Sequence, residues 1–299
     1  MSTPIRQNIA NLNDDERSSL VEAILELGRK KFADGVSYWF KQDQIHHGME
    51  HVHMFPDFLP WHRELLNKFE TMLQEVDPSV ALHYWDWTTD PRSTPDASGN
   101  AVNLFTEKCF GSSHGPAGKP FAGVLDNGGV LAGSRDEQPF PGDPVRPPRG
   151  ITRAMAQGTP PVDSDFRIVH VSDHLPESEQ WITFRRTLEG SPNHNIIHGW
   201  VGGTMGPPHS AFEEPFVFMM HSNIDRLWAM WQTQSGFEWR LDPGRVYGSE
   251  TAHPRITRPM EPWAGGTGIR PWAAPENLIE VKSARHPTVV VPPQYDTMP

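Results

Sequence analysis

The spacing of apolar residues along the chain predicts amphipathic helices separated by irregular segments. Side chains that recur three or four positions apart, and so share one face of an α-helix, occur in residues 15–32, 36–51, 62–76, 178–190 and 215–234. Asn13 or Asp14 is suited to cap the first of these helices, and Gly190 to end the fourth. The apolar pattern therefore predicts a mainly α protein.

Two prolines complicate the segment that precedes the third helix. Pro56 and Pro60 break the helical pattern there, because proline lacks a backbone N–H and its ring clashes with the preceding turn. We therefore expect His53 at the end of a segment or on a loop, and His62 at the opening of the helix. Arg63, the next residue, should face outward or form an ion pair.

Segments rich in proline and glycine separate and follow the helices. Residues 91–165 are dominated by Gly, Pro, Ser and Asp, so we expect a long surface excursion without regular core elements. Residues 240–299, rich in Pro and Trp, should form a tail packed on the core. His114, His253 and His286 have no partners at ligand spacing, and we expect them at the surface.

Composition limits the kind of protein this is. The 299 residues can bury a sizeable core, and no break in composition divides them, which favours a single domain over 1–299. A net charge of -11 makes nucleic acid an unfavourable partner, so a small neutral or cationic ligand fits better. The single Cys109 excludes an internal disulfide and a cysteine-rich metal site.

Targeting signals are lacking in the sequence as it stands. The first residues have no apolar core after a basic start, and no window approaches eighteen consecutive apolar residues. We therefore expect no membrane segment, and a protein that is either cytoplasmic or exported without a classical signal peptide.

Histidines form two clusters far apart in the chain. His194 and His198 lie four positions apart, which on a helix directs both imidazoles to one side, and His221 follows on the next helix. The upstream cluster falls within seventeen residues and comprises His46, His47, His51, His53 and His62. Two histidine-ligated metals in one core explain the pattern better than two unrelated surface patches.

The type of ligand limits which metal ions can bind. Neutral imidazoles suit copper, zinc, nickel and iron, whereas a di-iron site would need glutamates that are not at the required spacing. A zinc protease of the HExxH type would carry glutamate where this chain has Asn195. Three imidazoles per metal and no anionic ligand favour Cu(I), and a pair of such ions could exchange two electrons with dioxygen and then with an electron-rich ring such as a catechol.

Four segments together resemble a known family. They read HVHMFPDFLPWHRELLNKFE (51–70), LHYWDWTTDP (82–91), LEGSPNHNIIHGWVGG (188–203) and FMMHSNIDRLWAMWQ (218–232). The combination resembles the central domain of the tyrosinase family, the type-3 copper proteins that include catechol oxidases and the oxygen-binding units of molluscan haemocyanins. The resemblance implies a four-helix bundle core that holds a dicopper centre, wrapped by long Pro/Gly-rich loops.

The resemblance also implies which residues bind the two copper ions. The expected ligands are His46, His53 and His62 for one ion, and His194, His198 and His221 for the other. His47 is an alternative to His46, because the motif offers two adjacent histidines.

Further matches to the family concern proton transfer and access. Glu189 and Asn195 resemble the pair that holds a water thought to deprotonate incoming phenols, and Gly199 leaves the entrance open. Asp225, one turn after His221, is expected to orient groups behind the ligands. The alternative for Glu189 is a surface carboxylate at a helix end.

The chain also departs from some members of the family. No cysteine precedes His53, so the Cys–His thioether of plant and fungal relatives cannot form. No long domain follows residue 240, and we expect an enzyme that is active without proteolysis, with a separate copper-delivery protein as a conceivable partner.

The resemblance implies a copper oxidase that converts phenols, both monophenols and o-diphenols, to o-quinones with dioxygen as co-substrate. Alternatives on the same framework are a catechol oxidase or an o-aminophenol oxidase without monophenolase activity. A haemocyanin-like oxygen carrier is the rival from another functional class. The natural phenolic substrate and the oligomeric state stay open from sequence.

Overall fold

The computed structural model describes residues 4–31, 37–48, 52–122, 150–207, 210–265 and 281–298. Across these ranges the elements are overwhelmingly helical, and strands are confined to two short antiparallel pairs. No helix in them is both long and apolar enough to cross a membrane. The mainly α class predicted from the apolar spacing is confirmed.

The α-helices are α1 (Asp14–Arg29), α2 (Tyr38–Gly48), α3 (Phe58–Val76), α4 (Asp165–Val169), α5 (Glu177–Glu189), α6 (His194–Val201), α7 (Phe216–Gln232), α8 (Pro254–Thr257) and α9 (Pro287–Val290). The strands are β1 (Thr94–Pro95), β2 (Ala101–Val102), β3 (His114–Pro116) and β4 (Thr152–Ala154). Single 3₁₀ turns are η1 (Ile9–Asn11), η3 (Gly203–Met205), η4 (Ala211–Glu213), η5 (Glu238–Leu241) and η6 (Gly248–Glu250).

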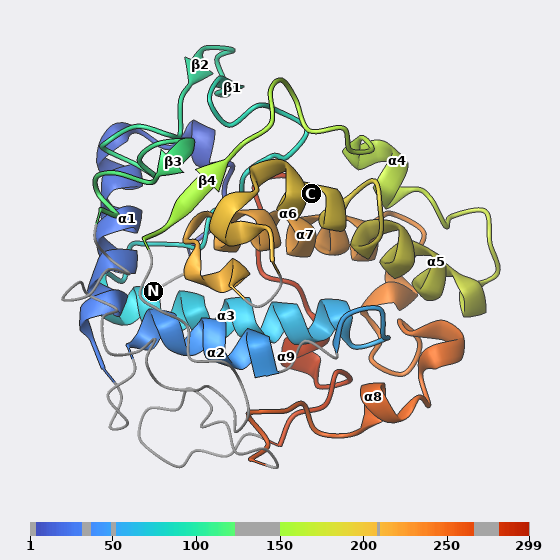
Figure 1. Ribbon diagram of the computed structural model, residues 1–299. Helices are drawn as coiled ribbons and strands as arrows, with labels where there is room; N and C mark the ends of the chain where they lie inside the picture. The colour runs from blue at the N-terminus through green and yellow to red at the C-terminus, as the bar shows by residue number, and fades with distance from the viewer. Residues whose placement is uncertain are drawn as a thin grey trace.

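The four helices α2, α3, α6 and α7 form the centre of the molecule. Figure 1 shows α2 and α3 side by side, with α6 and α7 on the facing side. Helix α3 also packs against α1 and α7, and α5 packs against α6. The expected four-helix core is therefore confirmed, with the remaining helices and loops arranged around it.

Helix α1 begins where the sequence predicts. The Asn13 side chain accepts hydrogen bonds from the backbone N–H groups of Asp15 (2.9 Å) and Glu16 (3.0 Å), and the Glu16 carboxylate accepts one from the Asn13 N–H (2.8 Å). This capping box satisfies donors that the first turn of a helix leaves without intrahelical partners. Asn13, rather than Asp14, is the cap.

The start of α3 differs from the expectation. The helix begins at Phe58, so Pro60 lies within its first turn and His62 on its second, rather than at its opening. Proline is tolerated in the first turn because its missing N–H would have no intrahelical acceptor there. His53 lies on the loop before the helix, as predicted.

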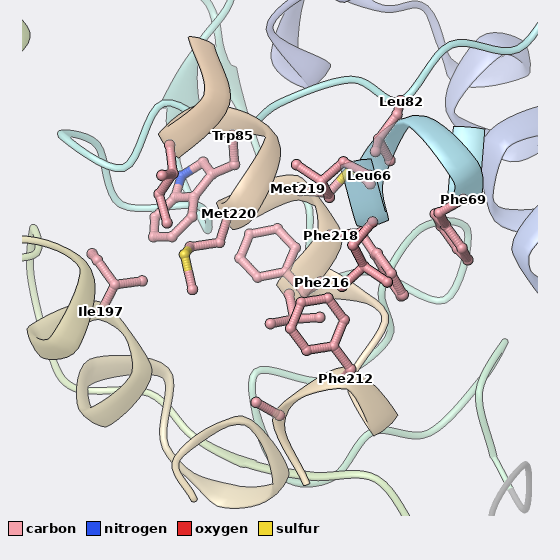
Figure 2. Close-up of a cluster of buried hydrophobic side chains, with 14 of the residues drawn as sticks. Leu66, Phe69, Leu82, Trp85, Ile197, Phe212, Phe216, Phe218, Met219 and Met220 are labelled. Atoms are coloured by element: carbon pink, nitrogen blue, oxygen red, sulfur yellow. The ribbon is translucent and has the colours of Figure 1, made fainter. Parts of the chain in front are cut away.

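Helix α7 is buried on nearly every side. Every residue of α7 except Met230 is buried, charged ones included, so this helix lies at the centre of the core. The Phe69 and Phe218 rings stack with their centroids 3.7 Å apart, joining α3 to α7. Figure 2 shows the cluster in which these residues pack with Trp85, Phe212 and other apolar side chains.

The segment 91–165 contains more regular structure than predicted. Strand β1 pairs with β2, and β3 pairs with β4, so backbone groups in a Gly/Pro-rich stretch are satisfied by short ladders. Leu104 and Phe110 are fully buried, and Arg153 on β4 forms a fully buried ion pair with Glu214 (2.6 Å). His114 is exposed, as expected. The part of this prediction that covers 123–149 lies outside the described residues.

Two histidines of the C-terminal segment have structural roles that the sequence did not indicate. The side chains of His253 and His286 accept hydrogen bonds from backbone N–H groups at the starts of α8 and α9, and both are half-buried rather than solvent-facing. A histidine in front of proline can cap a short helix, because the neutral ring offers one acceptor nitrogen. The predicted tail over 240–299 is described except for 266–280 and its last residue.

A buried carboxylate joins distant parts of the chain. Asp225 on α7 accepts hydrogen bonds from Arg63 on α3, from Arg6 (3.1 Å) and from the Tyr295 hydroxyl (2.8 Å). Arg63 is fully buried, so of the two alternatives for this residue the outward one is wrong and the ion pair is correct. Arg6 also pairs with Glu70 (2.8 Å).

We expect Asp225→Asn to lower the free energy of unfolding by about 3–5 kcal/mol, because it removes the countercharge of the buried Arg63 and leaves Arg6 with Glu70 alone. Denaturant unfolding of the metal-free protein measures the change. The matched control is Glu177→Gln, which removes the countercharge of Arg245 from an ion pair whose side chains are both exposed and should leave the unfolding midpoint close to that of the parent. Equal effects of the two substitutions would contradict this role for Asp225.

Candidate metal centre

Six histidines form two compact triads in the core. His46, His53 and His62 make one group, and His194, His198 and His221 make the other. Within each triad, one ring nitrogen from every histidine lies within 4.8 Å of the other two. All six side chains singled out as ligands from the sequence are thus brought together, three and three.

Different elements supply each triad. His46 comes from the last turn of α2, His53 from the loop that follows, and His62 from the second turn of α3. His194 and His198 lie one turn apart on α6, and their Nε2 atoms are 3.0 Å apart. The sixth histidine, His221, projects from the middle of α7.

The two triads face each other. Ring centroids of His62 and His221, one from each triad, are 5.0 Å apart in a stacked arrangement. The His53 and His194 rings are 6.1 Å apart and also nearly parallel. The separation between the triads is therefore similar to that within them, where the His46 and His53 centroids are 5.1 Å apart. Two metal ions held here would be close neighbours.

Hydrogen bonds fix which ring nitrogen faces the centre. The Nδ1 atoms of His62, His198 and His221 lie 2.8, 2.9 and 3.0 Å from the backbone oxygens of Phe58, Met205 and Val217. A carbonyl oxygen only accepts, so each Nδ1 carries the proton and donates it. The Nε2 lone pair is then left for a metal, as is usual for histidine ligands.

Several ring nitrogens of the two triads are buried without a hydrogen-bond partner. They are Nδ1 and Nε2 of His46, Nε2 of His62 and Nε2 of His221. Buried polar atoms without partners are costly, and converging imidazole nitrogens are the donors that copper and zinc prefer. The residues present therefore fit two histidine-bound metal ions.

Burial keeps the imidazoles neutral. Desolvation lowers the pKa of His46, His62, His194 and His221 well below the ordinary histidine value, and the neighbouring imidazoles lower it further. Burial lowers the pKa of His198 to about 4. At neutral pH the nitrogens are thus deprotonated and available, because only the neutral ring can donate its lone pair to a metal.

His47, the alternative first ligand, is not in the triad. It is half-buried, whereas the neighbouring His46 is almost completely buried and meets His53 and His62. Successive residues on a helix differ in direction by about 100°, so two adjacent histidines cannot both face the same point. His51 lies outside the described residues.

Aromatic rings enclose the triads. Phe212 on η4 lies 4.3 Å from the His46 ring and 4.9 Å from the His221 ring, measured between centroids. Phe58 lies 4.6 Å from His62 and 5.1 Å from His194. Phe212 lies in no motif that would have marked it in the sequence. Both rings exclude water from one side of the site.

A pocket of about 290 Å³ opens onto the histidines. It is lined by residues from both triads and by four others: His46, His53, Met54, Glu189, His194, Asn195, His198 and Gly206. Two larger pockets elsewhere on the described surface contain none of the six histidines. A small molecule that reacts at the metal centre would enter through the pocket of about 290 Å³.

Glu189 lies in this pocket rather than at the surface. Its residue is 1% exposed, one carboxylate oxygen accepts a hydrogen bond from the Met54 N–H, and the other, Oε2, is buried without a partner. Burial raises the pKa of the carboxyl to about 7, against the opposing effects of the Met54 N–H and of Arg185. The surface alternative for Glu189 is therefore wrong.

Asn195 and Gly199 lie at the outer side of α6, and both are exposed. The Asn195 Oδ1 atom is 3.0 Å from Nδ1 of His194, so it can accept the proton of that ring and orient it. A Cβ atom added at Gly199 would meet nothing within 4 Å. Gly199 is not among the residues that line the pocket, so its effect on the entrance stays a prediction.

Comparisons with known proteins agree with this geometry. Residues 34–234 match the model of the common central domain of tyrosinase. The chain is 32% identical to a tyrosinase from Streptomyces antibioticus, over 87% of this chain and 92% of that one. It is 29% identical to grixazone synthase from Streptomyces griseus, over 77% and 84% of the two chains. Octopus haemocyanin shares the fold: one functional unit aligns with a TM-score of 0.59 at 22% identity, covering 98% of this chain and 68% of that one.

Removing one histidine from either triad should remove one metal ion. We expect His46→Ala and His194→Ala each to retain one copper ion per chain instead of two, because two imidazoles hold copper less tightly than three. Mass spectrometry of the metal content after dialysis measures this. His47→Ala is the matched control and should retain both ions. Loss of copper from His47→Ala with retention in His46→Ala would reverse the assignment.

Proposed function

The chain belongs to the tyrosinase family, and from this membership and the two facing histidine triads we propose that it oxidises phenols to o-quinones with dioxygen. The observation that carries the proposal is the pocket that leads from the surface to both triads. Members of the family use a dicopper centre, so the cofactor is a pair of copper ions.

The ligand assignment is part of this proposal. His46, His53 and His62 would hold one copper ion, and His194, His198 and His221 the other. When bound, the copper pair supplies the two-electron exchange with dioxygen that the oxidation requires. The protein contributes the arrangement of neutral donors, the exclusion of water by Phe58 and Phe212, and the path for the substrate.

The size of the pocket is appropriate for a phenol. A cavity of roughly 150 Å³ accommodates benzene, so about 290 Å³ leaves room for a ring with one substituent. Histidine edges supply contact for the ring, whereas Glu189 and Asn195 supply the few polar groups that orient a ligand. The hydroxyl of the bound phenol would point toward the histidines.

Glu189 is proposed as the group that receives the phenolic proton, directly or through a water shared with Asn195. Its Oε2 atom is buried, lacks a partner and belongs to a residue of the pocket wall. A positioned carboxylate of this kind can act as a general base for a hydroxyl that is bound within hydrogen-bond reach. Asn195, which also orients His194, would form a second hydrogen bond to that water.

The overall reactions balance without another reductant or oxidant. One monophenol and one dioxygen give one o-quinone and one water. Two o-diphenols and one dioxygen give two o-quinones and two waters, with each diphenol losing two protons and two electrons. The first reaction must also replace a ring C–H bond with a C–O bond, which the second does not, and it is therefore the more demanding.

The alternatives on the same framework are a catechol oxidase or an o-aminophenol oxidase that lacks the first reaction. A reversible oxygen carrier is supported by the fold shared with octopus haemocyanin. The pocket that reaches the histidines favours an enzyme over a carrier, because a carrier needs no access for an aromatic ring.

We expect the copper-reconstituted protein to convert catechol to o-quinone, with smaller rates for a monophenol and an o-aminophenol. Quinone absorbance and oxygen consumption measure the rates side by side, and the metal-free protein serves as control. Reversible uptake of dioxygen with no quinone from any of the three substrates would identify a carrier. Turnover of catechol and o-aminophenol alone would identify an oxidase without monophenolase activity.

For the role of Glu189, we expect Glu189→Gln to lower the monophenol rate by about 10²-fold while changing the catechol rate much less. The amide can still accept the Met54 hydrogen bond but cannot take a proton, and catechol is the more acidic and more easily oxidised substrate. Glu179→Gln is the matched control, since Glu179 is exposed on the same helix. An equal loss on both substrates, or none on either, would contradict the role.

A further inference from the structure

Met54 has an unusual backbone conformation next to the metal centre. It follows His53 directly, and among the described residues it is the only one other than glycine with a positive φ, at 65°. Its side chain is not part of the core: the residue is 63% exposed. Yet Met54 is one of the few residues that line the pocket leading to the histidines.

Residues of α5 and η6 hold Met54 in this conformation. Its N–H donates to the Glu189 carboxylate, and its carbonyl oxygen accepts from Nη1 of Arg185 at 3.5 Å. Arg185 is in turn held by two hydrogen bonds to the Glu250 carboxylate, of 2.9 and 2.7 Å. The backbone is therefore fixed from both sides, as is typical where a left-handed residue persists at a functional site.

The positive φ at position 54 is unfavourable for methionine. The left-handed region is unfavourable for residues with a long side chain, and glycine or asparagine adopts it more readily. Both hydrogen bonds that hold the residue come from its backbone, so glycine would keep them. The exposed side chain adds little to core packing, which leaves the pocket as the place where it acts.

We propose that Met54 is a specificity-determining residue, whose side chain packs against an apolar substituent on the ring of the bound phenol. This rests on the proposed function, because it places a phenol in the pocket. A thioether side chain is flexible and polarisable, and it makes favourable contacts with aromatic and alkyl groups of different shapes. Phe55, the next residue, is also partly exposed, and its ring lies against the Arg255 guanidinium at 4.0 Å.

The location of Met54 predicts which substrates it favours. Its neighbour His53 belongs to a triad and Glu189 is buried, whereas Met54 itself is largely exposed, so Met54 lies on the solvent side of the pocket. A group attached to the ring away from the hydroxyl would meet it there. Phenols with a bulky alkyl substituent should therefore gain more from Met54 than the unsubstituted ring does.

The test compares Met54→Gly with Met54→Leu in the copper-reconstituted protein. We expect Met54→Gly to raise KM for 4-tert-butylcatechol about tenfold, while KM for catechol changes less than about twofold and kcat for both stays near the parent value. Met54→Leu, which keeps the apolar volume, should restore KM to within about twofold. Phe166→Ala, which removes an exposed aromatic residue of α4, is the matched control and should change neither KM.

A thermal unfolding measurement separates this role from a structural one. Glycine relieves the left-handed conformation, so Met54→Gly should have a Tm equal to or above that of the parent. A lower Tm together with equal losses on both catechols would show that Met54 acts through folding, and would overturn the proposal. An unchanged KM for 4-tert-butylcatechol in Met54→Gly would overturn it as well.

A binding measurement keeps the proposal testable if the protein proves not to be an oxidase. Calorimetric titration with benzoate and with 4-tert-butylbenzoate, which cannot form quinones, gives the affinity for the ring with and without the alkyl group. We expect Met54→Gly to lose about tenfold in affinity for 4-tert-butylbenzoate and little for benzoate. If the parent protein forms no quinone but Met54→Gly still loses affinity for 4-tert-butylbenzoate alone, the oxidase function is rejected and the role of Met54 is kept. Equal affinities of parent and Met54→Gly for 4-tert-butylbenzoate would reject that role.

Discussion

The carboxylate of Asp225 ties the metal-binding core to both ends of the chain. It lies one turn after His221 on α7, and it binds Arg63, the residue after His62 on α3. The same carboxylate binds Arg6 near the N-terminus and Tyr295 near the C-terminus. Histidines of both triads are thus attached to helices whose relative position is fixed by one buried set of ion pairs, which is costly to disrupt once the charges are out of water.

Desolvation is the second constraint, and it serves the chemistry of the site. Placing the imidazoles beside one another in the core lowers the pKa of His46, His62, His194, His198 and His221, so these five rings stay neutral and their nitrogens remain available. Hydrogen bonds to the carbonyls of Phe58, Met205 and Val217 then choose which nitrogen faces the centre. Without metal, this arrangement leaves buried nitrogens unsatisfied, so metal binding and the stability of the core are coupled.

The loop between α2 and α3 connects this centre to the pocket. His53 is one of the triad, Met54 lines the pocket, and Asp57 leads into α3. Glu189 binds the backbone of this loop through one oxygen, its other oxygen is buried without a partner, and the residue lines the pocket. One residue therefore both holds the loop and forms part of the pocket wall. This arrangement makes the shape of the pocket dependent on α5 as well as on the ligand-bearing helices.

The sequence by itself determined the features that depend on neighbouring residues. Helical spacing, the Asn13 cap and the four-residue step from His194 to His198 follow from local geometry, since each involves positions within one or two turns. The resemblance of four segments to the tyrosinase family supplied the fold and the cofactor, which the family match bears out. The predicted start of α3 at His62 was wrong, because proline is tolerated in the first turn of a helix and Pro60 lies there.

Only the tertiary structure decided the features that join distant residues. Arg63 is buried because Asp225 lies 162 positions away in the chain and next to it in space. Phe212 covers His46, Met54 is held left-handed by α5, and the short strands of 91–165 pair through contacts that no spacing announces. The choice between His46 and His47 as the member of the triad is of the same kind. Both are on the same helix, and the face that turns inward is set by what packs against it, which a single helix cannot specify.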